Sequence, residues 1–443
     1  MMRRREWLQG MGLLGLMGGL PGIRAVRAAD YKALVVVYLA GGYDGNNIVI
    51  PTDAAYADYT AARPGLALPR DTLAPLNGTH IGHTFGLSPA MAPLAELFNQ
   101  DRLAVVANVG ALVAPVTMTQ YRNRSVKLPP FIGSHADQQA WVQGWMGDAD
   151  RSGWGGRAMD ILAASGKQPL VALTSDYTAV FPRRSSLSLT DSGNSSRWGR
   201  VDLLNGGDRA LQQLEWFSRM QSTNAYEREF SRSLRVAYLD SIEFAKGQAM
   251  GPVPTGNFPD TRIGRDLRFL ARHIPYCKAT GATRQVYLVQ DGGYDVHSGQ
   301  LSTSESNPGQ EPRLQPVASS VAALDQSLRD AGMDGEVAVV VMTEFGRTLA
   351  QAGSGSDHAW GNHWFVLGGM VKGGRVYGDT FPSLVVGGPD DASYEPRRGW
   401  WLPQFSSDQF VADLVRWLGL DEQQTLSVMP HLANFARASI GYL

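Results

Sequence analysis

The sequence predicts an α/β protein in which a mostly parallel central sheet carries helices on both faces. Short apolar runs alternate along the chain with longer segments of helical periodicity, which is the order expected of parallel strands joined by helical crossovers. The runs are apolar at nearly every position, so both faces of the sheet should be buried. With 443 residues, of which 44% are hydrophobic and 18% charged, the chain has enough apolar material for such a core.

Five continuous apolar runs are expected to be strands. The first, Ala33–Ala40, is rich in Val and is followed by Gly41-Gly42. The others are Leu103–Val109, Gln285–Val289, Glu336–Met342 and Trp364–Leu367. The segments of helical periodicity between them are expected to be helices. These are Met91–Asn99, His135–Met146, Asp208–Lys246, Gly264–His273 and Val317–Asp330.

Three further segments are rich in turn-forming residues. Tyr177–Arg200 contains six serines together with Asn and Gly, and is expected to be a loop or a lid. Gly251–Pro259 and Ser302–Pro312 are expected to be connectors. The sequence has no repeat of solenoid period. Residues 29–443 are therefore expected to form a single α/β domain.

The N-terminal residues have the features of an export signal. Arg3-Arg4-Arg5 supplies a positive region, Met11–Leu20 an apolar centre, and Ala28 a small residue for cleavage, so residues 1–28 are expected to be removed. Arg4-Arg5-Glu6-Trp7-Leu8 resembles the twin-arginine pattern, with an ordinary secretory signal as the alternative. We expect a periplasmic or secreted protein that uses the twin-arginine export machinery.

Composition and charge argue against several classes of protein. The formal net charge is −1 and no long run of Lys or Arg occurs, which argues against a nucleic-acid partner. Cys277 is the single cysteine, so an internal disulfide framework and a thiolate-cluster metal site are excluded. No later segment reaches the roughly 20 apolar residues of a membrane span, so no transmembrane anchor is expected after cleavage. Any metal ion must be held by oxygen and histidine.

Carboxylate and histidine side chains gather at one edge of the predicted sheet. In open α/β sheets the functional groups lie just beyond the carboxyl ends of the strands. The candidate metal ligands there are Asp44, Asp295, His297, Glu344, Asp357, His358 and His363. Crowded carboxylates repel one another unless a cation neutralises them. We therefore expect one or two divalent ions, zinc, manganese or calcium, although a lone Asp after a strand is also a common turn former or helix cap.

A four-residue motif occurs after two of the expected strands. Gly41-Gly42-Tyr43-Asp44 recurs as Gly292-Gly293-Tyr294-Asp295, each time just after an apolar run. The further motifs of this edge are Asp295-Val296-His297-Ser298-Gly299-Gln300, Thr343-Glu344-Phe345-Gly346-Arg347-Thr348, and Asp357-His358 through Asn362-His363 to Gly368-Gly369. Together with the twin-arginine-like start, these motifs resemble an exported bacterial family, the domain of unknown function 1501, grouped with the alkaline phosphatase superfamily. The resemblance runs over nearly the whole mature chain and implies an alkaline-phosphatase-like fold.

The resemblance also implies a two-metal hydrolase and roles for these residues. Asp44 would be the ligand after the first strand, Asp295 and His297 the middle pair, and His358 or His363 the late histidine. Glu344 stands where the superfamily has an Asp followed by His. Phe345 follows it here, so that site has either lost a ligand or takes Asp357 instead.

The resemblance places the nucleophile at Ser134. Ser134-His135-Ala136-Asp137-Gln138-Gln139-Ala140-Trp141 and then Gly144 resembles the nucleophile helix of alkaline phosphatases. Ser134 is also expected at a helix N-terminus, where free amides favour an anion, so a capping serine without chemistry is the alternative. Cys277 and Ser306 lack the pattern that a formylglycine-dependent sulfatase needs. Arg347 is either an anion-binding fork or a structural arginine.

The implied function is an exported metal-dependent hydrolase of phosphate or sulfate esters, acting on a small-molecule or polymer substrate. The alternative is an exported binding or assembly protein that keeps the fold without turnover. A third hypothesis, carbohydrate binding, depends on the 11 Trp residues of the composition alone.

Overall fold

A mostly parallel sheet forms the centre of the computed structural model, which describes residues 31–147, 150–162, 169–173, 187–190 and, apart from 214 and 218, 212–443. The strands of this sheet are β1 (Lys32–Ala40), β5 (Leu103–Gly110), β6 (Leu170–Leu173), β7 (Leu187–Leu189), β8 (Arg284–Gly292), β9 (Val337–Met342), β10 (Asn362–Leu367), β11 (Arg375–Tyr377) and β12 (Phe405–Ser406). All five runs predicted to be strands are strands. The predicted α/β fold is therefore confirmed.

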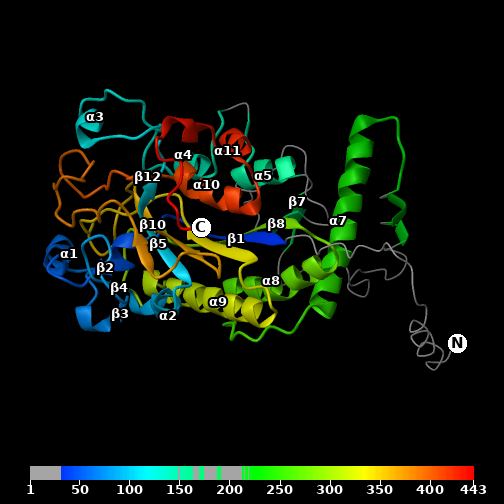
Figure 1. The fold of residues 1–443 in the computed structure, drawn as a ribbon, viewed down its shortest axis with the longest axis horizontal. Helices are drawn as coiled ribbons and strands as arrows, with labels where there is room; N and C mark the ends of the chain where they lie inside the picture. Colours follow the sequence, from blue (N-terminus) through cyan, green and yellow to red (C-terminus); the bar gives the residue numbers. More distant parts are fainter. Residues whose placement is uncertain are drawn as a thin grey trace, which may run out of the picture. The chain divides into compact units, whose positions relative to one another are not determined.

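The strand order brings several chain segments to one edge of the sheet. The order is β11-β5-β10-β9-β1-β8-β6-β7, with β12 paired to β5 (Figure 1). β1 lies in the middle, parallel to both β8 and β9. Among the described strands of this sheet, β10 alone runs antiparallel to both of its neighbours, β5 and β9. The residues that precede β10 therefore lie at the same edge as those that follow β1, β8 and β9.

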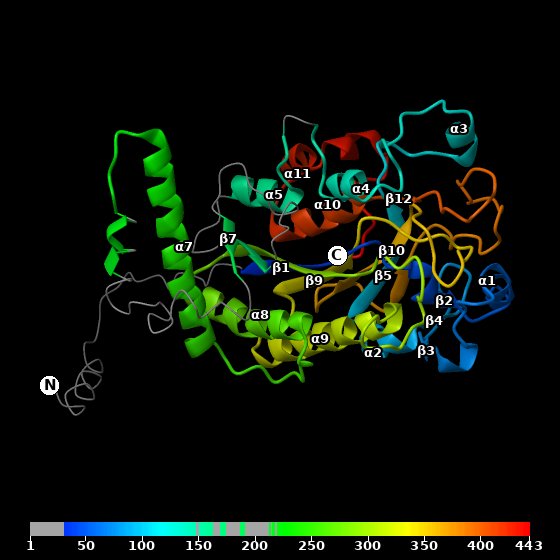
Figure 2. The same cartoon turned by 180° about the vertical axis from the view of Figure 1, so that it is seen from behind.

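Helices cover both faces of the sheet. On one face lie α2 (Ala92–Asn99), α8 (Arg262–Ala279) and α9 (Gln310–Asp330), and on the other lie α4 (His135–Val142), α5 (Trp154–Leu162), α10 (Ser407–Leu418) and α11 (Glu422–Val428) (Figure 2). The 26-residue helix α7 (Ala225–Met250) packs against α8. No helix among the described residues combines the length and the apolar character that a membrane span requires.

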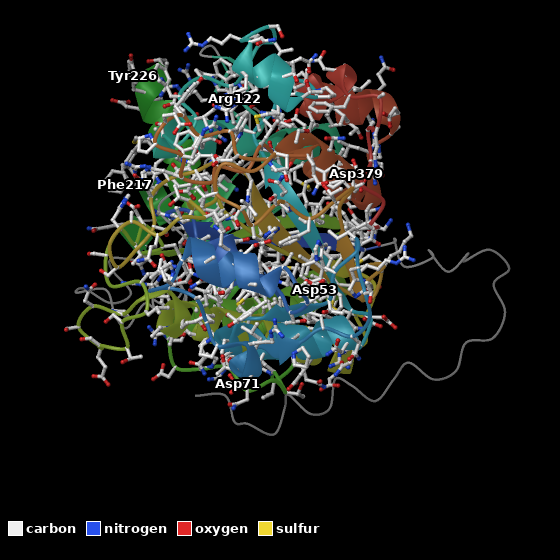
Figure 3. All side chains as sticks on the ribbon, turned by 90° about the vertical axis from the view of Figure 1, so that its left-hand side faces the viewer. Asp53, Asp71, Arg122, Phe217, Tyr226 and Asp379 are labelled. Carbon is white, nitrogen blue, oxygen red and sulfur yellow. The ribbon has the colours of Figure 1, made fainter. Side chains whose placement is uncertain are left out.

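Smaller elements occur in the first third of the chain, between residues 49 and 122. A second sheet has the antiparallel order β2-β4-β3, formed by Val49–Pro51, Phe85–Leu87 and Ala74–Pro75. The short helices α1 (Tyr56–Ala62) and α3 (Met118–Arg122) lie in the neighbouring connections. Figure 3 shows Asp53 and Asp71 on this part of the chain.

Several boundaries differ from the expected ones for local reasons. α4 ends at Val142 because Gly144 takes a positive φ of 77° two residues later. α7 begins only at Ala225, where the side chain of Asn224 caps the helix. Within the expected serine-rich loop, Leu187–Leu189 forms strand β7, parallel to β6. The expected signal peptide, residues 1–28, lies outside the described residues.

The helix α10 was not anticipated from the sequence, although its start carries a clear signal. The hydroxyl of Ser406 accepts the backbone N–H of Gln409, and the Gln409 side chain accepts the backbone N–H of Ser406. This reciprocal pair is a capping box. The helix packs its Phe410 edge-on against Trp364 of β10 at a centroid distance of 4.9 Å, so it helps to bury the strand that leads out of the candidate site.

Candidate metal centre

Four side chains from three segments meet beyond the carboxyl ends of the parallel strands. Asp295 and His297 follow β8, His358 precedes β10, and His135 is the first residue of α4. Oδ1 of Asp295 lies 2.9 Å from Nε2 of His297 and 3.1 Å from Nε2 of His358. The two Nε2 atoms are 3.1 Å apart. Nε2 of His135 lies 3.4 Å from Oδ2 of Asp295. We call these four residues the Asp295 cluster.

Hydrogen bonds outside the cluster orient two of its rings. Nδ1 of His358 lies 2.7 Å from the carbonyl oxygen of Gly133, and Nδ1 of His135 lies 2.9 Å from Oε1 of Glu344. Both partners are acceptors, so each Nδ1 carries the proton. Nε2 is then the nitrogen that each ring can offer to an ion on the Asp295 side. Hydrogen-bonded histidines of this kind are the usual form of metal-binding imidazoles in proteins.

The spacing of these donors fits a divalent cation. Ligand atoms about 2.1 Å from one ion lie roughly 3.0 Å apart in octahedral and roughly 3.4 Å apart in tetrahedral coordination. The contacts of 2.9, 3.1 and 3.1 Å among Asp295, His297 and His358 are close to these spacings. Without a cation, the lone pairs of the two rings would repel unless one ring took up a proton. Three imidazoles and one carboxylate suit zinc or manganese better than calcium, which prefers oxygen ligands.

Two groups of three candidate ligands have their donor atoms within 4.8 Å of one another, and they share His358. The first consists of His135, Asp295 and His358. The second takes in His297 of the cluster. It consists of His297, Asp357 and His358, with Oδ1 of Asp357 3.7 Å from Nδ1 of His297. The Nδ1 proton of His358 is held by the carbonyl of Gly133, so Nε2 is its one available nitrogen and serves one ion at a time. Oδ2 of Asp357 also pairs with Arg398 at 2.9 Å. The described residues therefore favour a single ion.

Arg347 holds Asp295 in place from beneath the cluster. Its side chain is buried, and Nη2 donates to Oδ1 of Asp295 at 2.6 Å. The same guanidinium donates to the carbonyls of Gly41, Gly42 and Tyr294. Partial burial tends to raise the pKa of Asp295, but the Arg347 guanidinium and the His358 ring outweigh it and hold the pKa well below its ordinary value. These contacts give Arg347 a structural role in place of the anion-binding role considered from the sequence.

Glu344 positions His135 and is not a member of either ligand group. Its carboxylate is fully buried. Oε1 accepts from His135 and from the backbone N–H of Gly41 at 2.8 Å, and Oε2 accepts from Tyr38 at 3.1 Å and Thr343 at 2.8 Å. Burial alone would raise the pKa of Glu344, but the bond from His135 helps to lower it, and the same bond raises the pKa of His135. In this structure Glu344 orients His135, and the metal-ligand role expected for Glu344 stays a prediction.

Phe345 forms a wall of the cluster. Its ring centroid lies 4.8 Å from that of His135 and 4.8 Å from that of His358. The ring fits because Gly42, with a φ of 70°, lacks a side chain; a Cβ there would come within 2.3 Å of it. Phe345 thus packs against two histidines of the cluster, His135 and His358.

Asp44 lies in a separate buried network. Its Oδ2 accepts from Nη1 of Arg63 at 2.6 Å and from Nε2 of Gln300 at 2.6 Å. Its Oδ1 accepts from the backbone and side-chain nitrogens of Asn46 at 3.1 and 2.9 Å. Arg63 is fully buried and supplies the positive charge that was expected from a metal ion. The metal-ligand role expected for Asp44 stays a prediction, in competition with this internal ion pair.

His363 is also held away from both ligand groups. It lies in β10, where Nδ1 accepts the backbone N–H of Asn108 at 3.2 Å. Its ring stacks on Phe381 at a centroid distance of 5.0 Å and packs against Trp401 at 5.2 Å. Burial lowers the pKa of His363 to about 3. This neutral, stacked ring is a core histidine, and the late histidine of the cluster is His358.

Ser134 lies in the chain between Gly133, whose carbonyl binds His358, and His135, a member of the cluster. It occupies the N-cap position of α4 but makes no side-chain capping bond. Its hydroxyl instead donates to Oδ2 of Asp137 at 2.6 Å. The simple capping role therefore does not account for this side chain, whose hydroxyl is paired with a carboxylate able to accept its proton.

His135 is the member of the cluster that sequence reasoning missed. The residue appears in the sequence only as the neighbour of Ser134, a long way from the three strand-end motifs. One signal could have identified it: His135 lies at the start of the helix that was expected to carry the nucleophile.

The fold and the Asp295 cluster together define a mixed α/β protein with a candidate metal centre for one ion at its strand ends. The chain belongs to the family described as "Protein of unknown function (DUF1501)", which matches residues 31–427. This confirms the resemblance found in the sequence. A comparison with curated proteins gave no match.

Solved structures show distant similarity. Ps i-CgsB in complex with k-i-k-neocarrahexaose is 8% identical, with 89% of this chain and 74% of that chain covered and a TM-score of 0.36. The PsFucS1 sulfatase from Pseudoalteromonas sp. is 9% identical, with 89% and 68% covered and a TM-score of 0.32. The phosphonate monoester hydrolase SpPMH from Silicibacter pomeroyi is 9% identical, with 89% and 74% covered and a TM-score of 0.31. Similarity at these scores does not bear on the activity of this chain.

Proposed function

We propose that this protein is an exported, metal-dependent hydrolase of phosphate or sulfate esters. The ligands of one divalent ion would be Asp295, His297, His358 and His135. The observation that carries the proposal is the convergence of three imidazole Nε2 atoms on one carboxylate, within 2.9–3.4 Å of its oxygens. When bound, a divalent ion supplies Lewis-acid stabilisation for the negative charge of an ester oxygen.

Ser134 is proposed as the nucleophile and Asp137 as the group that takes its proton. A serine hydroxyl is a weak nucleophile until a base removes its proton. As the Ser134 oxygen bonds to phosphorus or sulfur and the ester oxygen departs, the proton passes to Oδ2 of Asp137, 2.6 Å away. Water then hydrolyses the serine ester. Glu344 and Gly133 keep the rings of His135 and His358 in orientation throughout.

The test uses the mature protein with zinc or manganese supplied and aryl phosphate, phosphodiester and sulfate esters as substrates. Ser134→Ala should abolish turnover while the metal content measured by elemental analysis stays near that of the wild type. Ser125→Ala is the matched control, because Ser125 is an exposed serine of the same region. Turnover retained by Ser134→Ala would exclude its role as nucleophile.

Metal binding is tested separately from turnover. His297→Ala should lower the metal content and, through the lost ligand, the thermal stability in the presence of metal. His80→Ala is the control, because His80 bonds the carbonyl of Asn77 outside the cluster. Full metal occupancy in His297→Ala would exclude the Asp295 cluster as the metal centre.

A binding or assembly protein is the second candidate function. The pairing of Asp44 with Arg63 and the burial of His363 favour it, because these contacts would leave ligands for one ion in place of the two that the resemblance implies. This candidate predicts one ion per chain and no turnover of any of the three ester classes.

A further inference from the structure

A pocket of about 560 Å³ lies beside α4. Its volume is within the range of roughly 300–1,000 Å³ that is usual for small-molecule sites. The side chains that give it its character are Phe131, Asp137, Trp141, Trp145, Asp150 and Arg151. We call this the Trp145 pocket.

The Trp145 pocket and the Asp295 cluster share α4. His135, the first residue of the helix, faces Glu344 and Asp295, whereas Ala136, Asp137, Ala140 and Trp141 line the pocket. Asp137 connects the two, since its carboxylate lines the pocket and accepts the hydroxyl of Ser134 at 2.6 Å. A molecule that fills the pocket therefore lies beside Asp137, the partner of the Ser134 hydroxyl.

Aromatic rings dominate one side of the pocket. The rings of Trp141 and Trp145 are 5.2 Å apart, with Trp141 buried and Trp145 half-buried. Phe131 is 73% exposed and its backbone has a φ of 50°. Left-handed backbone is strained for a bulky residue, and burial does not compensate for it here. Strain that holds an aromatic ring in solvent at the rim of a pocket points to a ligand that covers the ring.

The polar lining narrows the class of ligand. Asp137 and Asp150 carry negative charges and Arg151 a positive one. Two carboxylates against one guanidinium disfavour a polyanion such as a nucleotide, and a purely apolar ligand would remove water from these charged groups at a cost in free energy. A sugar ring satisfies both sides of the pocket: its C–H faces pack on indole rings, and its hydroxyls donate to carboxylates.

We propose that the Trp145 pocket binds a carbohydrate ring, and that the ester substrate of the centre is a sugar ester whose ring occupies this pocket. The second part rests on the proposed function; the first part does not. The ring would lie against Trp145 and Phe131, with hydroxyls bonded to Asp137 or Asp150. The ester group would then extend past Asp137 toward Ser134.

Calorimetric titration of the full mature protein with uncharged hexasaccharides of glucose and of galactose tests the proposal. We expect saturable binding of one of them with a Kd of about 0.1–1 mM. Trp145→Ala and Phe131→Ala should each weaken it about tenfold or more, because stacked aromatic groups dominate such contacts. Phe131→Ala should fold normally, since the side chain is exposed. Trp216→Ala is the matched control, because Trp216 is 64% exposed outside the pocket, beside Phe217, which is labelled in Figure 3.

The outcomes separate this inference from the proposed function. Binding that persists in chelator-treated protein supports the carbohydrate pocket independently of the metal. If the metal-supplied protein binds the sugar but hydrolyses no ester, the carbohydrate pocket is supported and the hydrolase is not. No saturable binding of either hexasaccharide up to about 10 mM, which corresponds to less than 3 kcal/mol of binding free energy, would overturn the inference. So would an affinity left unchanged by both Trp145→Ala and Phe131→Ala.

Discussion

The Glu344→Gln substitution gives a direct test of how the Asp295 cluster is held. The glutamine oxygen can take the place of Oε1, accepting from His135 and from the backbone of Gly41. Its NH₂ group then faces the hydroxyls of Tyr38 and Thr343, which can rotate to accept. The shape and the bonding are preserved, so loss of the negative charge behind His135 is the main change.

Loss of such a carboxylate typically weakens metal binding by about 10–100-fold, which corresponds to about 1.4–2.8 kcal/mol. The affinity for zinc is measured by competition with a chromophoric chelator at fixed pH. Glu243→Gln provides the matched control, because Glu243 is a buried glutamate of α7 that pairs with Lys246 and Tyr276. It should bind zinc like the wild type.

Two results would contradict the positioning role of Glu344. Unchanged zinc affinity in Glu344→Gln would show that its charge does not act on His135. A loss as large as that of Asp295→Asn, which removes a ligand charge directly, would show that Glu344 itself binds the ion.

Three further outcomes are expected. Asp44→Asn should lower the free energy of unfolding by about 3–5 kcal/mol, because it leaves the buried Arg63 without its partner; zinc affinity, measured by chelator competition, should be unchanged, and a clear loss would restore Asp44 as a ligand. Burial raises the pKa of Asp408 to about 7, so the folded state binds this proton more tightly than the unfolded state, and stability from Asp408 should fall as pH rises from about 4 to about 7. Urea unfolding across this range should show a flatter pH profile for Asp408→Asn; equal slopes would refute the assignment. Changing Arg4 and Arg5 to Lys should retain the precursor in the cytoplasm, as followed by cell fractionation, whereas normal export would exclude the twin-arginine route.

Five strands of the central sheet could be predicted because each contains a nearly continuous apolar run. Every residue of Ala33–Leu39 in β1 is buried, so its sequence carries the signal of a doubly covered strand. The short strands β11 and β12 carry no such signal, because two or three residues do not define a period. α10 was not predicted, although its sequence carries both a capping box and an amphipathic pattern of helical period.

The edge of the sheet could be predicted, but not which residues of that edge meet. Asp295, His297 and His358 were found because they adjoin strands. His135 was missed because it belongs to α4 and does not follow a strand. The loop that brings α4 to this edge has no periodic sequence pattern from which its path could be predicted. The sequence also could not show that Arg63, 19 residues after Asp44, would fold back onto it.

The repeated Gly-Gly-Tyr-Asp motif shows how the same local sequence gives two different sites. Both aspartates follow strands of one parallel pair, β1 and β8, and both face an arginine at 2.6 Å. The side chain of Asp44 is 2% exposed, and Arg63, Gln300 and Asn46 occupy its oxygens. Asp295 is 44% exposed.

This difference in exposure decides which aspartate can take a metal ion. Arg347 contacts Oδ1 of Asp295 from the buried side, and the three histidines approach its carboxylate in the partly exposed cluster. A divalent ion that enters from solvent meets an oriented carboxylate with three imidazole rings around it. At Asp44 the same ion would have to displace a buried guanidinium and then leave that charge unpaired, which is costly in a protein interior. The expected stoichiometry of one ion per chain follows from this competition between an internal cation and an external one.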